Sequence, residues 1–184
     1  MNFGIVKLPI EGPLVIESKV YRDTRGCFYE TYSRQAFARL GIDVEFVQDN
    51  CSFSKRGTLR GMHFQKRHPQ AKLVYVLQGR AFDVVIDLRK GSPCFGQWHG
   101  EILDAQSKRL LYVPVGFAHG FLALSDSVEF AYKCSDYYRP DDEGGLLWSD
   151  PDVGIDWPLQ KVGEPLLSDR DQKWPRLNQL DFYF

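Results

Sequence analysis

Two stretches of the sequence decide the fold: GTLRGMHFQ, at residues 57–65, and PVGFAH, at residues 114–119, about fifty residues further along. Each contains one histidine, His63 in the first and His119 in the second. Histidine is a common metal ligand, but a catalytic metal site normally uses about three protein ligands. Two histidines alone are too few, so the two stretches predict a site whose chemistry does not depend on a resident ion.

The two stretches resemble the paired motifs of cupin barrels, in which histidines and a glutamate usually hold a metal. Gly57 and His63 stand at their expected places, but Gln65 occupies the position of the second histidine and Lys72 that of the glutamate. An ammonium group beside a divalent cation would repel it. The resemblance implies an all-β, cupin-like jelly-roll barrel that keeps the pocket and has changed its chemistry.

Simple alternation along a strand distributes the side chains of the first stretch. His63 shares a face with Gly61 and Gln65, whereas Arg60 points the opposite way. Glycine within a strand often marks a β-bulge, and a bulge at Gly61 would redirect one of these side chains.

Strand patterns dominate the rest of the chain. The run RAFDVVIDL, at residues 80–88, alternates between two faces with the period of a strand. Such spacing predicts a sandwich or a barrel. Similar short runs recur at 13–17, 27–32, 44–49, 71–77, 95–103, 109–113, 119–124 and 127–134.

The dipeptide Gln78-Gly79 suggests a tight turn between two of these runs. A two-residue hairpin there would pair strands 71–77 and 80–86 and set Val74 opposite Asp83. Lys72 would then lie diagonal to Asp83, within reach of a charge contact.

One helix is predicted at residues 34–40, with Ser33 as its N-cap and Gly41 as its stop. Its apolar stripe is Ala36, Phe37 and Leu40. Residues 138–184 are rich in Asp, Pro and Gly, and they predict loops and short helices folded over one end of the barrel. We expect a single domain spanning residues 1–184.

Composition narrows the function classes. The chain has 184 residues, 43% of them hydrophobic, and a formal net charge of −1. The sequence has no run of Lys or Arg, so its charge pattern does not fit a nucleic-acid-binding protein. No apolar run approaches the roughly 20 residues that span a membrane, and the N-terminus lacks a signal-peptide pattern. We therefore expect a cytoplasmic protein whose four cysteines are reduced and pack as small hydrophobes. They are Cys27, Cys51, Cys94 and Cys134.

Strings distributed over nearly the whole chain resemble the dTDP-4-dehydrorhamnose 3,5-epimerase family and follow its order. The resemblance implies an isomerase that inverts C3 and C5 of dTDP-4-dehydro-6-deoxy-D-glucose, giving dTDP-4-dehydro-6-deoxy-L-mannose for dTDP-rhamnose biosynthesis. It also implies a homodimer without metal or organic cofactor; a strand at 13–17 could extend a partner's sheet. The strings are DTRGCFYE (23–30), FVQDN (46–50), LRGMHFQ (59–65), AKLV (71–74), FDVVIDLR (82–89), PVGFAHGF (114–121), YKCSDYY (132–138) and SDRD (168–171).

The chemistry of such a reaction explains the catalytic residues that the resemblance implies. A 4-keto group acidifies the hydrogens on C3 and C5, so epimerisation needs a base on one face and an acid on the other. His63 suits the base because its ordinary pKa lies near neutrality. By resemblance Asp171 orients His63 and Tyr132 is the acid. The cation Lys72, with Arg60 nearby, could polarise the ketone or meet the developing oxyanion charge.

The resemblance also implies a cradle for the nucleotide sugar. Tyr138 matches an aromatic that stacks on thymine. Arg170 stands where the family often has lysine, and Cys51 and Tyr75 depart from the common residues. The implied substrate-binding residues are Arg25, Glu30, Gln48, Asn50, Arg60, Lys72, His119, Glu143 and Arg170.

Each residue also has an ordinary structural interpretation. His63 and His119 could be satisfied core histidines, and Tyr132 a core tyrosine with a tethered hydroxyl. Asp171 could be a solvated carboxylate, and Asp83 could only hold Lys72. The tryptophans are expected in packing or interfaces: Trp98, Trp148, Trp157 and Trp174.

Three other functions stay open at this point. The nearest is a sister activity on a dTDP-4-keto sugar, either a 3- or 5-mono-epimerase or a 3,4-ketoisomerase. The second is a metal-dependent cupin oxygenase or isomerase, which chelation would reveal. The third is a non-catalytic sugar-binding barrel, which would bind a dTDP-sugar without exchanging any C–H proton.

Overall fold

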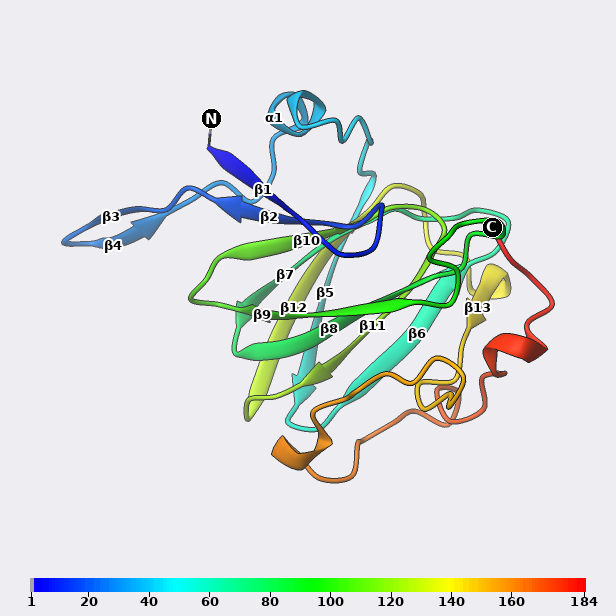
Figure 1. The fold of residues 1–184 in the computed structure, drawn as a ribbon. Coiled ribbons are helices and arrows are strands. Elements are labelled where there is room, and N and C mark those ends of the chain that lie inside the picture. The colour runs from blue at the N-terminus through cyan, green and yellow to red at the C-terminus, as the bar shows by residue number, and fades with distance from the viewer. Residues whose placement is uncertain (1) are drawn as a thin grey trace.

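Two antiparallel sheets face each other in this computed structural model, which describes residues 2–184 (Figure 1). The six-stranded sheet has the order β1-β2-β10-β7-β12-β5 and the five-stranded sheet the order β13-β6-β11-β8-β9. The predicted all-β, cupin-like jelly roll is confirmed. The strands are β1 (Phe3–Lys7), β2 (Leu14–Ser18), β3 (Tyr21–Asp23), β4 (Gly26–Phe28), β5 (Gln48–Lys55), β6 (Leu59–Gln65), β7 (Lys72–Gln78), β8 (Arg80–Asp87), β9 (Trp98–Asp104), β10 (Arg109–Val113), β11 (Phe117–Ala123), β12 (Ser127–Cys134) and β13 (Glu143–Gly145).

The main core lies between the two sheets. Alternate residues of each strand point inward, so that Val74 and Phe130 of one sheet meet Val85 and Phe121 of the other. The rings of Phe121 and Phe130 stack with their centroids 4.2 Å apart, and both residues line the pocket described below. Burial of these aliphatic and aromatic side chains is the main stabilising contribution.

Much of the chain after β13 covers the outer face of the five-stranded sheet, and Figure 1 shows its later part in orange and red. Trp157 packs edge-on against Phe82 of β8 at 5.8 Å, in a second core that includes Val84 and Leu180. The expected loops and short helices are confirmed, and residues such as Tyr138, Glu143 and Asp171 do lie over the pocket end of the barrel, whereas much of the tail packs instead on the outer face of the sheet. The outward face of β8 is apolar and needs this cover. The short 3-10 helices are Pro140–Asp142, Leu159–Lys161 and Leu177–Gln179.

The α-helix α1 (Arg34–Arg39) lies on the outer face of the six-stranded sheet. Its buried residue Phe37 meets Phe3 at 5.1 Å in an edge-to-face contact. Ser33 occupies the N-cap position, although its side chain makes no capping hydrogen bond. Gly41 follows the helix with φ 84°, as expected for a glycine stop. The predicted helix is confirmed.

The predicted hairpin at Gln78-Gly79 is wrong. β7 and β8 belong to different sheets, and Val74 of β7 pairs with Leu111 and Tyr132 rather than with Asp83. Gly79 is a corner between the sheets: it has φ 84°, and a Cβ there would lie 2.1 Å from the carbonyl oxygen of Ser127. A glycine signals a sharp turn but not the sheet to which the chain turns.

The N-terminal strands also differ from the expectation. β2, predicted at 13–17, pairs with β1 on one side and β10 on the other, so it is not a free edge for a partner's sheet. The edge is β1, which the sequence pattern missed. The run predicted at 44–49 becomes β5 at 48–55, because Val44 and Phe46 pack beside the helix instead. The run predicted at 27–32 shortens to β4, the second strand of a small hairpin with β3.

All four cysteines are free thiols. Cys134 is buried and Cys94 partly buried, but Cys27 and Cys51 are exposed, so the expectation that all four pack as small hydrophobes is wrong for these two. None of the helices among residues 2–184 is long and apolar enough to cross a membrane.

Candidate active site

A bulge in β6 sets the direction of the first functional residues. His63 pairs with His119 of β11, and Arg60 pairs with Phe121, so two residues of β6 stand opposite a single residue of β11. Gly61, which has φ 141°, is one of the two β6 residues in this bulge. The expected bulge at Gly61 is confirmed.

The bulge requires glycine on both strands. A Cβ on Gly61 would lie 2.6 Å from the Cα of Gly120, so the backbones approach more closely than any side chain permits. Because the extra residue breaks the alternation, Arg60 and His63 both line the same pocket, whereas Met62 turns into the outer core.

The pocket has a volume of about 340 Å³ and lies between the two sheets at one end of the barrel. This volume falls within the range of small-molecule sites, about 300–1,000 Å³. The structure brings together most of the residues that the sequence singled out: Gln48, Asn50, Arg60, His63, Lys72, His119, Tyr132, Tyr138, Glu143, Arg170 and Asp171.

His63 and Asp171 form a charge-assisted pair. The Nε2 of His63 donates to the Oδ1 of Asp171 at 2.6 Å. The His63 side chain is 22% exposed and the Asp171 side chain 4%, so the imidazole is reachable from the pocket and the carboxylate is shielded behind it. Burial would raise the pKa of the Asp171 carboxyl, but the hydrogen bond and charge of His63 hold it below its ordinary value.

The indole of Trp174 supports this pair. Its Nε1 donates to the Oδ1 of Asp171 at 3.2 Å, and its ring meets that of His63 edge-on at 6.2 Å. Trp174 lies against Gly145 of β13, where a Cβ would be 2.2 Å from the indole. The expectation that Trp174 is only a packing or interface residue is therefore wrong. The sequence offered no signal for it, because the contact depends on the path of the tail.

His119 of β11, the strand next to that of His63, forms a second pair with Asp83 of β8. The Nε2 of His119 donates to the Asp83 carboxylate at 2.9 Å, and both side chains are buried. Burial raises the pKa of the Asp83 carboxyl, against the opposing effect of His119 and Lys72. The interpretation that Asp83 serves only to hold Lys72 is wrong, since its hydrogen-bond partner is His119.

Lys72 points into the pocket from β7. Its Nζ has no hydrogen bond or ion pair among residues 2–184. Burial lowers the pKa of the Lys72 ammonium, and Glu143 and Asp83 oppose this effect. The amine therefore faces the cavity without a protein partner, and in its protonated form it is placed to meet a developing oxyanion.

Tyr132 occupies the wall opposite His63. It belongs to β12 of the six-stranded sheet, where it pairs with Asn50 and Val74, whereas His63 belongs to the five-stranded sheet. Burial raises the pKa of the Tyr132 phenol, with Arg60 opposing, so the phenol stays protonated near neutral pH. Two side chains that are chemically able to transfer protons therefore face one cavity from different sheets.

A rim of polar side chains surrounds the mouth of the pocket. The hydroxyl of Tyr138 donates to the Glu143 carboxylate at 3.0 Å, and Arg170 forms an ion pair with the same carboxylate. Gln48 and Asn50 are joined by a 2.9 Å hydrogen bond on the neighbouring wall. The rim offers an exposed aromatic ring and a guanidinium, groups that can receive a base and a phosphate.

Two predicted substrate-binding residues lie outside the pocket. Arg25 is in the β3–β4 hairpin, 89% exposed and paired with Asp23 at 2.6 Å. Glu30 follows the hairpin and accepts a hydrogen bond from Asn2. Figure 1 shows this hairpin projecting away from the barrel, so neither residue can reach the pocket of its own chain in this conformation.

Other pocket residues were not predicted as site residues. Gln65 was noted only as the replacement of a metal ligand, and Ser168 only as part of the string SDRD. Strand alternation could have predicted Ser52 of β5 and Phe130 and Cys134 of β12, because these residues share faces with Asn50 and Tyr132. They are Ser52, Phe64, Gln65, Gln70, Gly120, Phe121, Phe130, Cys134 and Ser168.

The donor set does not fit the metal that cupin barrels usually hold. The carboxamide of Gln65 is engaged with the backbone of Arg139, and Lys72 supplies a cation where a carboxylate would be needed. Among residues 2–184, no three His, Cys, Asp or Glu side chains converge as metal ligands.

Comparisons with known proteins agree with this geometry. The family model described as dTDP-4-dehydrorhamnose 3,5-epimerase matches residues 7–179. The chain is 47% identical to the enzyme of that name from Methanothermobacter thermautotrophicus over 99% of this chain and 98% of the relative, and 49% identical to that of Pseudomonas aeruginosa over 91% and 92%. A crystal structure of the dTDP-6-deoxy-D-glucose-3,5-epimerase of Legionella pneumophila in complex with dTDP-4-keto-L-rhamnose is 46% identical, with a TM-score of 0.94 over 97% of this chain and 95% of that one.

Proposed function

The chain belongs to the dTDP-4-dehydrorhamnose 3,5-epimerase family, and on this premise we propose how its own residues carry out the reaction. The enzyme is an isomerase that converts dTDP-4-dehydro-6-deoxy-D-glucose to dTDP-4-dehydro-6-deoxy-L-mannose by inverting C3 and C5. The observation that carries the proposal is the placement of His63 and Tyr132 on opposite walls of one pocket.

His63 is the base in this proposal. Because its Nε2–H is directed to Asp171, its Nδ1 remains to accept a proton from the carbon next to the ketone. The carboxylate of Asp171 stabilises the imidazolium that forms, in the manner of the aspartate in a catalytic triad. The C–H electron pair moves into the adjacent C–C bond, and the ketone oxygen takes up negative charge.

Lys72 meets that negative charge. Its ammonium is poorly solvated, so its attraction to an enolate oxygen is stronger than in water. His119 lies beside it, oriented by Asp83, and can hold the substrate near the ketone. Arg60, from β6 of the other sheet, adds positive charge to the same pocket.

Tyr132 returns a proton to the opposite face of the enolate. A raised pKa keeps its phenol protonated before the transfer, and the phenolate that forms lies near the cation Arg60. Repetition of the same sequence at the second carbon inverts both centres. His63 must lose its proton to solvent, and Tyr132 must regain one from solvent, after the first inversion and before the second carbon reacts; the same exchange after the second inversion restores the starting state.

The nucleotide occupies the rim. Tyr138 receives the thymine ring, and Arg170 with the neighbouring polar groups receives the diphosphate. The substrate is therefore a dTDP-4-keto-6-deoxy sugar.

We also propose a homodimer. Arg25 and Glu30 match substrate-binding positions but lie outside the pocket of their own chain, so they can contact substrate only in the pocket of a second subunit. The same hairpin exposes Tyr21 and Phe28, apolar surface that a partner would cover. Four free cysteines fit a reducing, cytoplasmic location.

The test is a reaction in heavy water with dTDP-4-dehydro-6-deoxy-D-glucose, followed by NMR. We expect deuterium at both C3 and C5 and the L-configured product. Inversion at one carbon alone would instead show a mono-epimerase, and binding without exchange would show a sugar-binding protein.

A further inference from the structure

The segment from Ser135 to Gly145 crosses the mouth of the pocket from one sheet to the other. It leaves the six-stranded sheet at the end of β12 and joins the five-stranded sheet as β13, whose Glu143 pairs with Gln65 of β6. On its way it carries Tyr138 and Glu143, the two rim residues that face the nucleotide in the proposed function.

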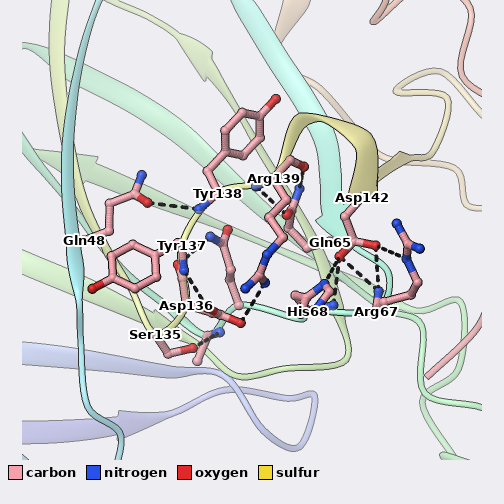
Figure 2. A network of polar contacts seen from close by, with 12 residues as sticks. Gln48, Gln65, Arg67, His68, Ser135, Asp136, Tyr137, Tyr138, Arg139 and Asp142 are labelled. Atoms are coloured by element: carbon pink, nitrogen blue, oxygen red, sulfur yellow. Dashed lines mark hydrogen bonds and ion pairs between the residues drawn. The ribbon is translucent and has the colours of Figure 1, made fainter.

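Two glutamines, one from each sheet, hold the middle of this segment (Figure 2). The Oε1 of Gln48 in β5 accepts the backbone N–H of Tyr138 at 2.9 Å. The Oε1 of Gln65 in β6 accepts the backbone N–H of Arg139 at 3.0 Å, and the Nε2 of Gln65 donates to the carbonyl oxygen of the same residue at 3.0 Å. A carboxamide is the neutral side-chain group that can donate and accept in this way.

The end of the segment is held independently. The buried carboxylate of Asp142 accepts the backbone N–H groups of Arg67 and His68, and it also pairs with the Nε of Arg67 at 2.9 Å. With the ends fixed by β12 and by Asp142, two side chains set the backbone at Tyr138: Gln48 accepts the N–H of Tyr138 itself, and Gln65 holds both the N–H and the carbonyl oxygen of the next residue, Arg139. Figure 2 shows that ring directed away from the hydrogen-bonded backbone.

We propose that Gln65 is a positioning residue for the nucleotide: it fixes the backbone of Arg139 and thereby the ring of Tyr138. This inference rests on the proposed function. It assigns a role to the glutamine that stands where a metal-binding cupin has a ligand. Gln65 is 4% exposed, and both ends of its amide are engaged with one backbone unit, so its effect on substrate passes through the segment that it holds.

Binding of dTDP, which involves no chemistry, is the direct measure. Gln65→Met keeps the length of the side chain but removes both hydrogen bonds, which frees the backbone behind Tyr138. We expect the Kd for dTDP and the KM to rise roughly tenfold, with kcat changed by less than about twofold, because uniform binding is lost while transition-state contacts remain.

A double-mutant cycle with Tyr138→Ala separates positioning from a general loss of structure. If Gln65 acts through the Tyr138 ring, Gln65→Met weakens dTDP binding in the wild-type background and has little further effect once that ring is removed. The matched control is Gln78→Met. Gln78 also bridges two strands through its amide, to Ser127 at 3.0 Å, but it lies outside the pocket, and its replacement should leave dTDP affinity unchanged.

Gln65→Glu provides a second test in a variant of nearly the same shape. Its ionised carboxylate would face the carbonyl oxygen of Arg139 and weaken dTDP binding, whereas the protonated acid can donate there as the amide does. The ratio of its Kd to that of wild type, measured at each pH, should therefore fall toward one as the pH is lowered.

The outcomes separate the two proposals. Normal dTDP affinity of Gln65→Met, or full additivity of this change with Tyr138→Ala, would overturn the role of Gln65. The proposed function would stand in that case, provided that the wild-type protein turns over the substrate. A wild-type protein that neither binds dTDP nor exchanges substrate protons would overturn both.

Discussion

His63 and Asp171 lie 108 residues apart in the chain, yet their side chains share a 2.6 Å hydrogen bond. The contact joins a barrel strand to the irregular tail, and the indole of Trp174 donates a second hydrogen bond to the same carboxylate oxygen. The tail is thus part of the catalytic apparatus in the proposed mechanism, because it supplies the group that orients the base.

Replacement of these two residues should have unequal effects. His63→Ala should abolish both epimerisation and deuterium exchange, since it removes the proposed base. Asp171→Asn should lower kcat by about 10²–10⁴-fold, because an amide can orient the ring but does not stabilise the imidazolium. Asp169→Asn, two residues away, is the control and should retain activity. Wild-type exchange by His63→Ala would move the base elsewhere.

Activity should survive removal of divalent metals. Lys72 places a positive charge in the pocket, and the Gln65 amide is engaged with the Arg139 backbone, so the pocket lacks the ligand set of a metal-binding cupin. The measurement is kcat before and after exhaustive chelation, with total metal determined on the same sample. Loss of activity that a divalent cation restores would contradict the account.

The hairpin should act in the pocket of a partner subunit. Light scattering should show a dimer, and Arg25→Ala should raise KM for the dTDP-sugar, whereas Arg22→Ala in the same hairpin should not. Mixing inactive His63→Ala with Arg25→Ala subunits under exchange conditions should restore part of the activity, because the second subunit regains a partner with an intact Arg25. An active monomer, or no restoration in verified mixed dimers, would exclude action between subunits.

Asp142 should stabilise the fold in a pH-dependent way. Burial would raise the pKa of its carboxyl, but hydrogen bonds from Arg67 and His68 hold it far below the ordinary value. A lowered folded-state pKa contributes stability that is fully present above the unfolded pKa, about 3.9, and is lost as the pH falls below it. Asp142→Asn should therefore unfold at lower urea concentration than wild type at pH 7, and the difference should shrink toward pH 3.

The neighbouring residue offers a control for this effect. Asp141 is exposed and forms only a 3.6 Å ion pair with Arg67, so Asp141→Asn should change stability little. Equal urea midpoints for Asp142→Asn and wild type at pH 7 would show that the buried carboxylate does not stabilise the segment.

Local patterns predicted the barrel well where one strand face is buried. The alternation in residues 80–88 and 127–134 identified β8 and β12, because inward and outward positions differ sharply in polarity. Glycine in the middle of residues 59–65 correctly indicated a bulge. The same residue type misled at Gly79, since a tight turn between consecutive strands and a corner between sheets both need a positive φ.

The site required more than local patterns. No periodicity connects Asp171 or Trp174 with β6; their position depends on the tail's apolar residues packing on the outer face of the five-stranded sheet. Resemblance to a family supplied Asp171, whereas Trp174 and the double hydrogen bond of Gln65 emerge only from the three-dimensional arrangement. Arg25 shows the converse, because its string matched the family while its location points to another subunit.

The central claim is that His63 and Tyr132 transfer protons on opposite faces of the enolate. Tyr132→Phe keeps the ring and removes only the hydroxyl. The base can therefore still form the enolate, but the proposed proton donor on the opposite face is gone. The most direct measurement is the ratio of deuterium incorporation to inverted product at C3 and C5, for this variant and for wild type in heavy water. We predict that inversion falls by about 10²–10⁴-fold and that exchange with retained configuration falls much less. An unchanged ratio at near-normal turnover would contradict the account and make Tyr132 a core tyrosine.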